Sequence, residues 1–181
     1  EGYVTYRCRT MHIEVELTMY VGVDEPVKYF RFKITNNDTK KRTLSLFCYL
    51  ELLMGSLPIE TRKHLSFEVR EGNILVATQE YRQQFPNSRI VAGVVSGADE
   101  FTMSREEFLG RNGDVRDPAS LKRTKLSSEI VTNEEPVAAL RKKIYLQPGE
   151  IAIETLFLGC VDEDELPRLL TRLKDAQNTE A

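Results

Sequence analysis

The chain of 181 residues has no tryptophan, only three cysteines and only two histidines. Cys8, Cys48 and Cys160 lie far apart and form no Cys-x-x-Cys pair. Neither a zinc site nor a complete disulfide framework follows from such a pattern. We therefore expect free thiols that are buried or half-buried and behave as small apolar groups. This expectation favours a reducing, cytoplasmic location.

Neither sign of charge is in large excess, because 25 Lys and Arg stand against 28 Asp and Glu, a net charge of -3. Nucleic-acid-binding domains normally have a basic surplus, so nucleic acid is not an expected partner. No apolar run approaches the roughly 20 residues of a membrane helix. The start, Glu1-Gly2-Tyr3, lacks the basic and apolar regions of a signal peptide. We expect no membrane contact, and a start without Met is typical of an excised domain.

The residues needed for several kinds of catalysis are also missing. His12 and His64 accompany no Gly-x-Ser-x-Gly nucleophile elbow. The two glycines of Gly110-Arg111-Asn112-Gly113 are not followed by the Lys and Ser or Thr of a phosphate-binding loop. Adjacent carboxylates such as Glu106 and Glu107 point in different directions, which favours a solvated surface over a glycosidase acid pair. We predict no catalytic residue, no metal site and no cofactor.

What the chain does contain is alternation of apolar and polar residues with a period of two, which is typical of half-buried strands. Tyr3–Tyr20 is predicted as the first strand on this basis. Short strands that recur at intervals of roughly 10 to 15 residues indicate an all-β fold, an antiparallel β-sandwich. The further predicted strands are Val27–Thr35, Thr43–Leu53, Leu65–Val69, Ile74–Thr78, Ile90–Val95, Pro136–Leu146 and Ile151–Gly159.

Only the C-terminal end departs from the strand pattern. Leu166, Leu169, Leu170 and Leu173 recur at the spacing of an amphipathic helix, and residues 162–165 place acidic groups before it. The apolar face of this helix must cover either this sandwich or a neighbouring domain, and the sequence leaves both open. We divide the chain into a sandwich domain, residues 1–161, and a helix with linker, residues 162–181.

The segment from Phe101 to Leu121 mixes aromatic, charged and glycine residues and is predicted to be a loop with one helical turn. Ser104 is a candidate N-cap, with Glu107 three residues later. Phe101, Phe108 and Leu109 are the candidate core anchors of this loop.

The polar residues of the same loop are the candidate binding residues. Arg105, Arg111, Asn112 and Asp114 supply planar donors and acceptors that suit vicinal hydroxyls or an anion. A surface loop held by its own internal contacts would have the same composition. The residues alone do not separate these two interpretations.

The order of the motifs resembles the N-terminal β-sandwich domain of glycoside hydrolase family 94, formerly glycosyltransferase family 36. Within that family the likeness is to cyclic β-1,2-glucan synthases and β-1,2-oligoglucan phosphorylases. It spans nearly the whole chain. The motifs are Ile13–Thr18, Pro26-Val27-Lys28, Ile34-Thr35-Asn36, Arg42–Leu46, Tyr49-Leu50-Glu51, Leu53-Met54-Gly55, Arg105–Gly113, Asp117–Leu121, Leu126-Ser127, Pro136–Leu140 and Leu146–Glu150.

The resemblance implies a supersandwich of the galactose-mutarotase type in an inverting enzyme. Members cleave β-glucosides with inorganic phosphate and release α-glucose 1-phosphate, and their catalytic residues lie in a separate, downstream α/α barrel. The chain alone should therefore be a non-catalytic domain that packs on this barrel, and its terminal helix from Asp162 should lead toward it. Two departures from the family pattern are Ser104, where Asp is usual, and Val137, where Cys is frequent.

The resemblance also implies homodimers in which a loop of the sandwich reaches the sugar site of the neighbouring subunit. By position, Arg105 to Asn112 is similar to that loop, so Arg105 is the first candidate for substrate contact. The alternative is a stand-alone carbohydrate-binding or interaction module. In the absence of tryptophan, such a module would have to stack sugar rings on Tyr81, Phe85 or Tyr145.

Overall fold

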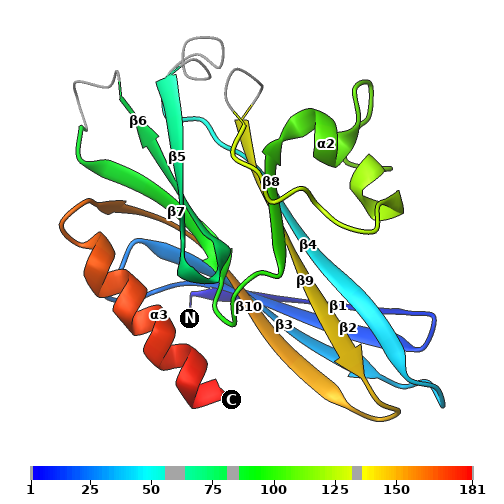
Figure 1. Ribbon diagram of the computed structural model, residues 1–181. Helices are drawn as coiled ribbons and strands as arrows, with labels where there is room; N and C mark the ends of the chain where they lie inside the picture. Colours follow the sequence, from blue (N-terminus) through cyan, green and yellow to red (C-terminus); the bar gives the residue numbers. More distant parts are fainter. Residues whose placement is uncertain (1, 56–63, 81–85, 132–135, 181) are drawn as a thin grey trace.

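The structure, a computed structural model, describes residues 2–55, 64–80, 86–131 and 136–180. Two antiparallel sheets pack face to face in a sandwich, with a helix on the outside of the larger one (Figure 1). The larger sheet has the strand order β1 (Tyr3–Thr10), β2 (Ile13–Val21), β3 (Val27–Asn36), β10 (Ile151–Asp162), β7 (Ser88–Val94), β6 (Ile74–Gln79) and β5 (Leu65–Arg70). The smaller sheet has the order β4 (Arg42–Glu51), β9 (Pro136–Leu146) and β8 (Glu100–Ser104).

The predicted antiparallel sandwich is confirmed. Most strands predicted from alternation are present, with ends that differ by up to three residues. The prediction of a single strand from Tyr3 to Tyr20 is wrong, because the chain reverses at Met11 and His12 to form the β1–β2 hairpin. Both residues have positive φ, 46° and 64°, as a two-residue type I′ turn requires. Asn and Gly are the usual residues at such a turn, so Met11 and His12 do not signal one.

Strand β8 was not predicted, because residues 101–104 fall in the segment that we interpreted as a loop. Phe101 and Met103 point into the sandwich and join its central cluster. Thr102 and Ser104 point the other way and are also buried, because the following segment lies over them. One face of β8 is buried in the apolar core, and its polar face is buried under the following segment. The strand therefore has no solvent-exposed face, which is the feature that usually reveals a strand in the sequence.

The core between the sheets joins residues from both layers. Leu75, Val94 and Leu156 of the larger sheet pack against Met103 and Leu140 of the smaller one. A second cluster, which contains Ile13, Ile34, Ile144 and Leu146, fills the end of the sandwich near the β1–β2 turn. The two sheets are thus held by one apolar layer that runs along most of their shared length.

Helix α3 (Leu166–Glu180) packs on the outer face of the larger sheet (Figure 1, red). Leu166, Leu169 and Leu173 contact a cluster that includes Val27 and Phe157. The apolar face of the predicted helix therefore covers this sandwich itself. No helix among the described residues has the length and apolar character needed to cross a bilayer.

The cysteine prediction holds only in part. All three thiols are free, and Cys48 is half-buried on β4, where burial raises the pKa of its thiol to about 11. Cys8 and Cys160 are exposed, contrary to expectation. Cys8 lies on β1, an edge strand whose residues are all exposed, so alternation along the sequence did not report burial there.

Candidate functional site

A covering segment, residues 105–131, lies over the outer face of the smaller sheet and contains the helix α2 (Arg105–Leu109) and the short 3-10 helix η3 (Ala119–Lys122). Phe108 is its main anchor, because its ring stacks on Tyr49 with centroids 4.8 Å apart and meets Phe47 edge-on at 5.9 Å. Leu109 and Leu126 are buried in the same cluster. The predicted anchoring by Phe101, Phe108 and Leu109 is confirmed.

The predicted N-cap is also confirmed, since Ser104 Oγ accepts a hydrogen bond from the backbone N–H of Glu107 at 3.1 Å. The Glu107 carboxylate does not complete a capping box. Instead it accepts hydrogen bonds from Thr102 Oγ1 and from the N–H and hydroxyl of Ser127, the latter two at 2.8 and 2.6 Å. Burial raises the pKa of this carboxyl, but the bonds from Ser127 and Thr102 outweigh burial and lower it. Glu107 therefore ties the two ends of the covering segment together.

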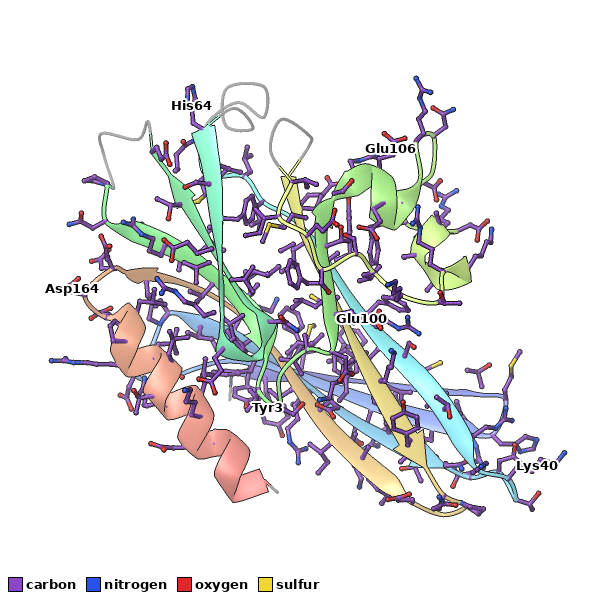
Figure 2. The ribbon with its side chains drawn as sticks, in the orientation of Figure 1. Tyr3, Lys40, His64, Glu100, Glu106 and Asp164 are labelled. Carbon is purple, nitrogen blue, oxygen red and sulfur yellow. The ribbon has the colours of Figure 1, made fainter. Side chains whose placement is uncertain are left out.

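A second carboxylate, that of Glu100 at the start of β8, also holds the covering segment on the smaller sheet (Figure 2). It accepts hydrogen bonds from Leu126 N–H at 2.9 Å, from Arg141 at 3.2 Å and from Lys143. The Arg141 guanidinium also lies 5.4 Å from the centre of the Phe47 ring. Burial opposes ionisation of Glu100, yet these partners lower its pKa. No sequence motif indicates this network, although alternation does place Arg141 and Lys143 on one face of β9.

Arg105 is the first residue of α2, and its side chain is 32% exposed. Its Nε lies 3.8 Å from an oxygen of Glu51, which is at the end of β4 and is 64% exposed. A separation of 3.8 Å is an ion pair rather than a hydrogen bond. Glu51 is therefore one charge partner of Arg105, and Ser104 acts as the helix cap.

Arg111 and Asn112 occupy the two central positions of a tight turn, and both are exposed. Gly113 N–H closes the turn on Gly110 C=O at 3.1 Å. Gly110 has φ of 95°, and a Cβ on Gly113 would lie 1.9 Å from the carbonyl oxygen of Leu109. The two glycines therefore fix the shape of the turn, which holds Arg111 and Asn112 in solvent.

Asp114 follows the turn and is exposed, and its Oδ1 accepts the backbone N–H of Arg116 at 2.7 Å. The four predicted residues thus lie on one covering segment, with Arg105 at one end of α2 and the other three beyond its opposite end. A helix of five residues is about 8 Å long. The arrangement places cationic, amide and carboxylate groups along one segment of the chain.

Among the described residues, no three His, Cys, Asp or Glu side chains are placed to hold a metal ion. Of the three aromatic residues in the module interpretation, the structure describes Tyr145 alone. Tyr145 is 68% exposed at the far end of β9, whereas Tyr81 and Phe85 lie outside the described residues.

Comparison with known proteins gives matches that span almost the whole chain. The family model for the glycosyl hydrolase 94 supersandwich domain matches residues 1–176. Cyclic beta-(1,2)-glucan synthase NdvB of Rhizobium meliloti (strain 1021) is 28% identical over 176 residues, which are 96% of this chain and 6% of that protein.

A second relative is N,N′-diacetylchitobiose phosphorylase of Vibrio furnissii, which is 24% identical over 191 residues and matches 99% of this chain and 23% of that protein. Among solved structures, a polysaccharide lyase superposes with a TM-score of 0.57 at 10% identity, over 93% of this chain and 23% of the other. That similarity shows the fold alone. The chain spans less than a quarter of the length of these relatives.

Proposed function

The chain belongs to the glycosyl hydrolase 94 supersandwich family, and we propose that it serves as a non-catalytic domain of a longer carbohydrate phosphorylase or cyclic β-glucan synthase. The observation that carries this proposal is the match over residues 1–176 in a chain that spans only 6% and 23% of two of its relatives. The relatives' names specify a β-1,2-glucan and a chitobiose derivative. A β-glucan or oligosaccharide is accordingly the proposed substrate, and inorganic phosphate the co-substrate of the parent protein.

The state of the two carboxylates that hold the covering segment supports a non-catalytic role. A general acid for glycosidic cleavage needs a raised pKa so that it holds its proton near neutral pH. Glu100 and Glu107 instead have lowered pKa values, because cationic groups, hydroxyls and backbone N–H groups bind their ionised forms. Both residues are engaged in holding the covering segment.

We infer that the exposed side of the covering segment contacts the saccharide or phosphate of the parent enzyme. Arg105, Arg111 and Asn112 provide the donors, and Asp114 an acceptor. Their support is rigid, since Phe108, Glu107 and the two glycines of the turn fix the backbone beneath them. A site that is already ordered loses little conformational entropy on binding. A downstream α/α barrel and a second subunit are the proposed partners that complete this site.

The test is a kinetic comparison in the full-length parent enzyme. Arg105→Ala should lower kcat/KM by about 10- to 150-fold, which corresponds to roughly 1.5–3 kcal/mol for the loss of a charged hydrogen bond. Arg70→Ala is the matched control, because Arg70 pairs with Glu68 on the edge strand β5. Unchanged kinetics for Arg105→Ala would reject the contact.

Glu51→Gln separates substrate contact from a purely structural ion pair. If Arg105 acts on the ligand, Glu51→Gln should retain most of the activity that Arg105→Ala loses. If Arg105 serves only to pair with Glu51, both variants should lose activity to the same extent. An equal loss of activity in the two variants would therefore show that Arg105 stabilises the domain and does not contact the ligand.

The module alternative predicts that the isolated chain binds sugar. Titration with β-1,2-gluco-oligosaccharides and cellobiose, followed by amide resonances, should give no saturable shifts at millimolar sugar if the site needs a barrel. Saturable shifts around residues 101–116 that vanish in Arg105→Ala would favour an independent module. Shifts that vanish in Tyr145→Ala would place such a module on β9.

A further inference from the structure

The turn that follows α2 (Figure 1) contains the dipeptide Asn112-Gly113. Asn112 is exposed, and among the described residues no group hydrogen-bonds its side chain. Asparagine is one of the chemically labile residues of proteins. It is most labile when glycine follows, because the backbone nitrogen of the next residue is the attacking atom and a side chain there hinders the attack.

The fold itself requires glycine at position 113. A Cβ there would lie 1.9 Å from the carbonyl oxygen of Leu109 and 2.8 Å from its carbonyl carbon. Both atoms belong to the backbone, so no side-chain rotation relieves the contact. The packing of the turn on the end of α2 therefore excludes every other residue after Asn112. The labile dipeptide is a consequence of this close approach.

One hydrogen bond holds the attacking atom in the folded turn. Gly113 N–H donates to Gly110 C=O at 3.1 Å. Exposed turns open at the low end of the range of local unfolding free energies. Opening of this bond frees the Gly113 nitrogen and leaves the buried anchors Phe108 and Leu109 in place. The reaction therefore does not need global unfolding.

We propose that Asn112 is a site of spontaneous deamidation. The Gly113 backbone nitrogen loses its proton to solvent base and attacks the side-chain amide carbon Cγ of Asn112, and the amide nitrogen leaves as ammonia. The product is a five-membered succinimide ring. Water then opens the ring at either carbonyl and gives aspartate or isoaspartate at position 112. Each conversion consumes one water and releases one ammonia.

The structure distinguishes Asn112 from the other asparagines whose side chains it describes. Asn36 is fully buried, and its Nδ2 lies within hydrogen-bonding distance of three backbone carbonyl oxygens. Asn73 donates to a backbone carbonyl at 2.7 Å and precedes isoleucine, whose branched side chain hinders attack. Asn37 and Asn87 are exposed, as Asn112 is, but precede aspartate and serine. Asn112 alone among these five combines exposure with a following glycine.

Deamidation changes the groups that the covering segment offers. Asn112 loses its amide donor and gains a negative charge next to Arg111, and isoaspartate also adds a methylene to the backbone. The effect on activity rests on the proposed contact of this segment with saccharide or phosphate. A carboxylate repels phosphate and competes for Arg111, so the converted parent enzyme should have a several-fold higher KM. The binding strength of the site would then fall with the age of the protein.

Peptide mapping of the chain tests the modification without any activity measurement. Trypsin cleaves after Arg111 and Arg116, so Asn112 lies in a short peptide of its own. After incubation at mildly alkaline pH, below the unfolding temperature, mass spectrometry should show conversion of Asn112 several-fold faster than that of Asn37 or Asn87. The rate should rise with pH, because the attacking nitrogen must lose its proton. Equal rates at the three positions, or an unchanged Asn112, would overturn the proposal.

Asn112→Gln is the matched control, because glutamine would have to form a six-membered ring and does so much more slowly. The conversion should disappear from this peptide in the variant. Asn36 is the internal control and should stay intact in the folded chain. A parallel incubation in urea measures the unfolded rate. Conversion of Asn112 that occurred only in urea would show that the folded turn protects it, and would also overturn the proposal.

Kinetics of the parent enzyme separate the modification from the proposed function. Asn112→Asp supplies the charge of the converted residue without the extra methylene, and it should raise KM several-fold. Wild-type KM in Asn112→Asp, together with conversion of Asn112 in the peptide map, would support the modification and reject the contact of Asn112 with substrate. A raised KM without conversion in the map would support the contact and reject the modification.

Discussion

The Phe108 ring lies almost parallel to the Tyr49 ring, with centroids 4.8 Å apart and planes inclined by 17°. This contact joins helix α2 to strand β4 of the smaller sheet. An isolated helix of five residues is not stable in water, so tertiary packing must hold α2 in place. The position of Arg105, three residues before Phe108 on the same short helix, therefore depends on this aromatic contact.

Phe108→Ala should destabilise the domain by about 3–5 kcal/mol, because it removes a ring that is only 3% exposed and leaves a cavity. Urea unfolding of the isolated chain measures this change. Leu121→Ala is the control in the same segment, since Leu121 is 57% exposed and should cost no more than about 0.5 kcal/mol. Similar losses in both variants would show that Phe108 is not the anchor.

Gly113→Ala should distort the turn that presents Arg111 and Asn112. The new Cβ would lie 1.9 Å from Leu109 C=O, so the backbone must shift, at an expected cost of about 1–3 kcal/mol. Amide resonances should move in residues 109–114 and stay in place in the core strands. Gly2→Ala, where a Cβ meets no atom within 4 Å, should leave both stability and spectrum unchanged. A spectrum of Gly113→Ala identical to wild type would contradict the required close approach.

The strands could be predicted because alternation reports burial wherever one face of a sheet meets solvent. The rule failed at two places for physical reasons. Met11 and His12 adopt left-handed backbone without the residues that usually signal it, so the hairpin looked like one long strand. Strand β8 is covered on both faces, so its apolar and its polar residues are both buried and no residue of the strand faces solvent.

The site could be predicted only where its contacts are local. The cap between Ser104 and Glu107 spans three residues and was visible in the sequence. Glu100 instead binds Arg141, 41 residues away, and Glu107 binds Ser127, 20 residues away. Such pairs depend on strand order and on the path of the covering segment. A single sequence records neither.

Helix α3 should be a structural part of the sandwich rather than a flexible linker. Leu169→Ala should lower the unfolding free energy by about 2–5 kcal/mol, since Leu169 is 4% exposed against the larger sheet. Lys174→Ala, on the solvent side of the same helix, should leave stability close to wild type. Denaturant unfolding compares the two variants. Near-wild-type stability of Leu169→Ala would show that α3 detaches without cost.

Glu100 should contribute stability that disappears in acid. Its folded-state pKa is lowered, so the unfolded chain binds this proton first as pH falls. The contribution is therefore complete above the ordinary glutamate pKa of about 4.3 and is lost as pH falls through the lowered folded-state value. Glu100→Gln leaves Arg141 and Lys143 without their carboxylate and should cost about 1–3 kcal/mol at pH 7.

The difference between wild type and Glu100→Gln should then narrow as the pH falls below about 4, because the wild-type carboxyl becomes neutral as well. Urea unfolding at pH 7, 5 and 3 measures this difference. Glu129→Gln, at an exposed position, is the matched control and should stay close to wild type at pH 7. A cost for Glu100→Gln that stayed constant down to pH 3 would mean that shape and packing, rather than the charge of Glu100, hold the covering segment on the sheet.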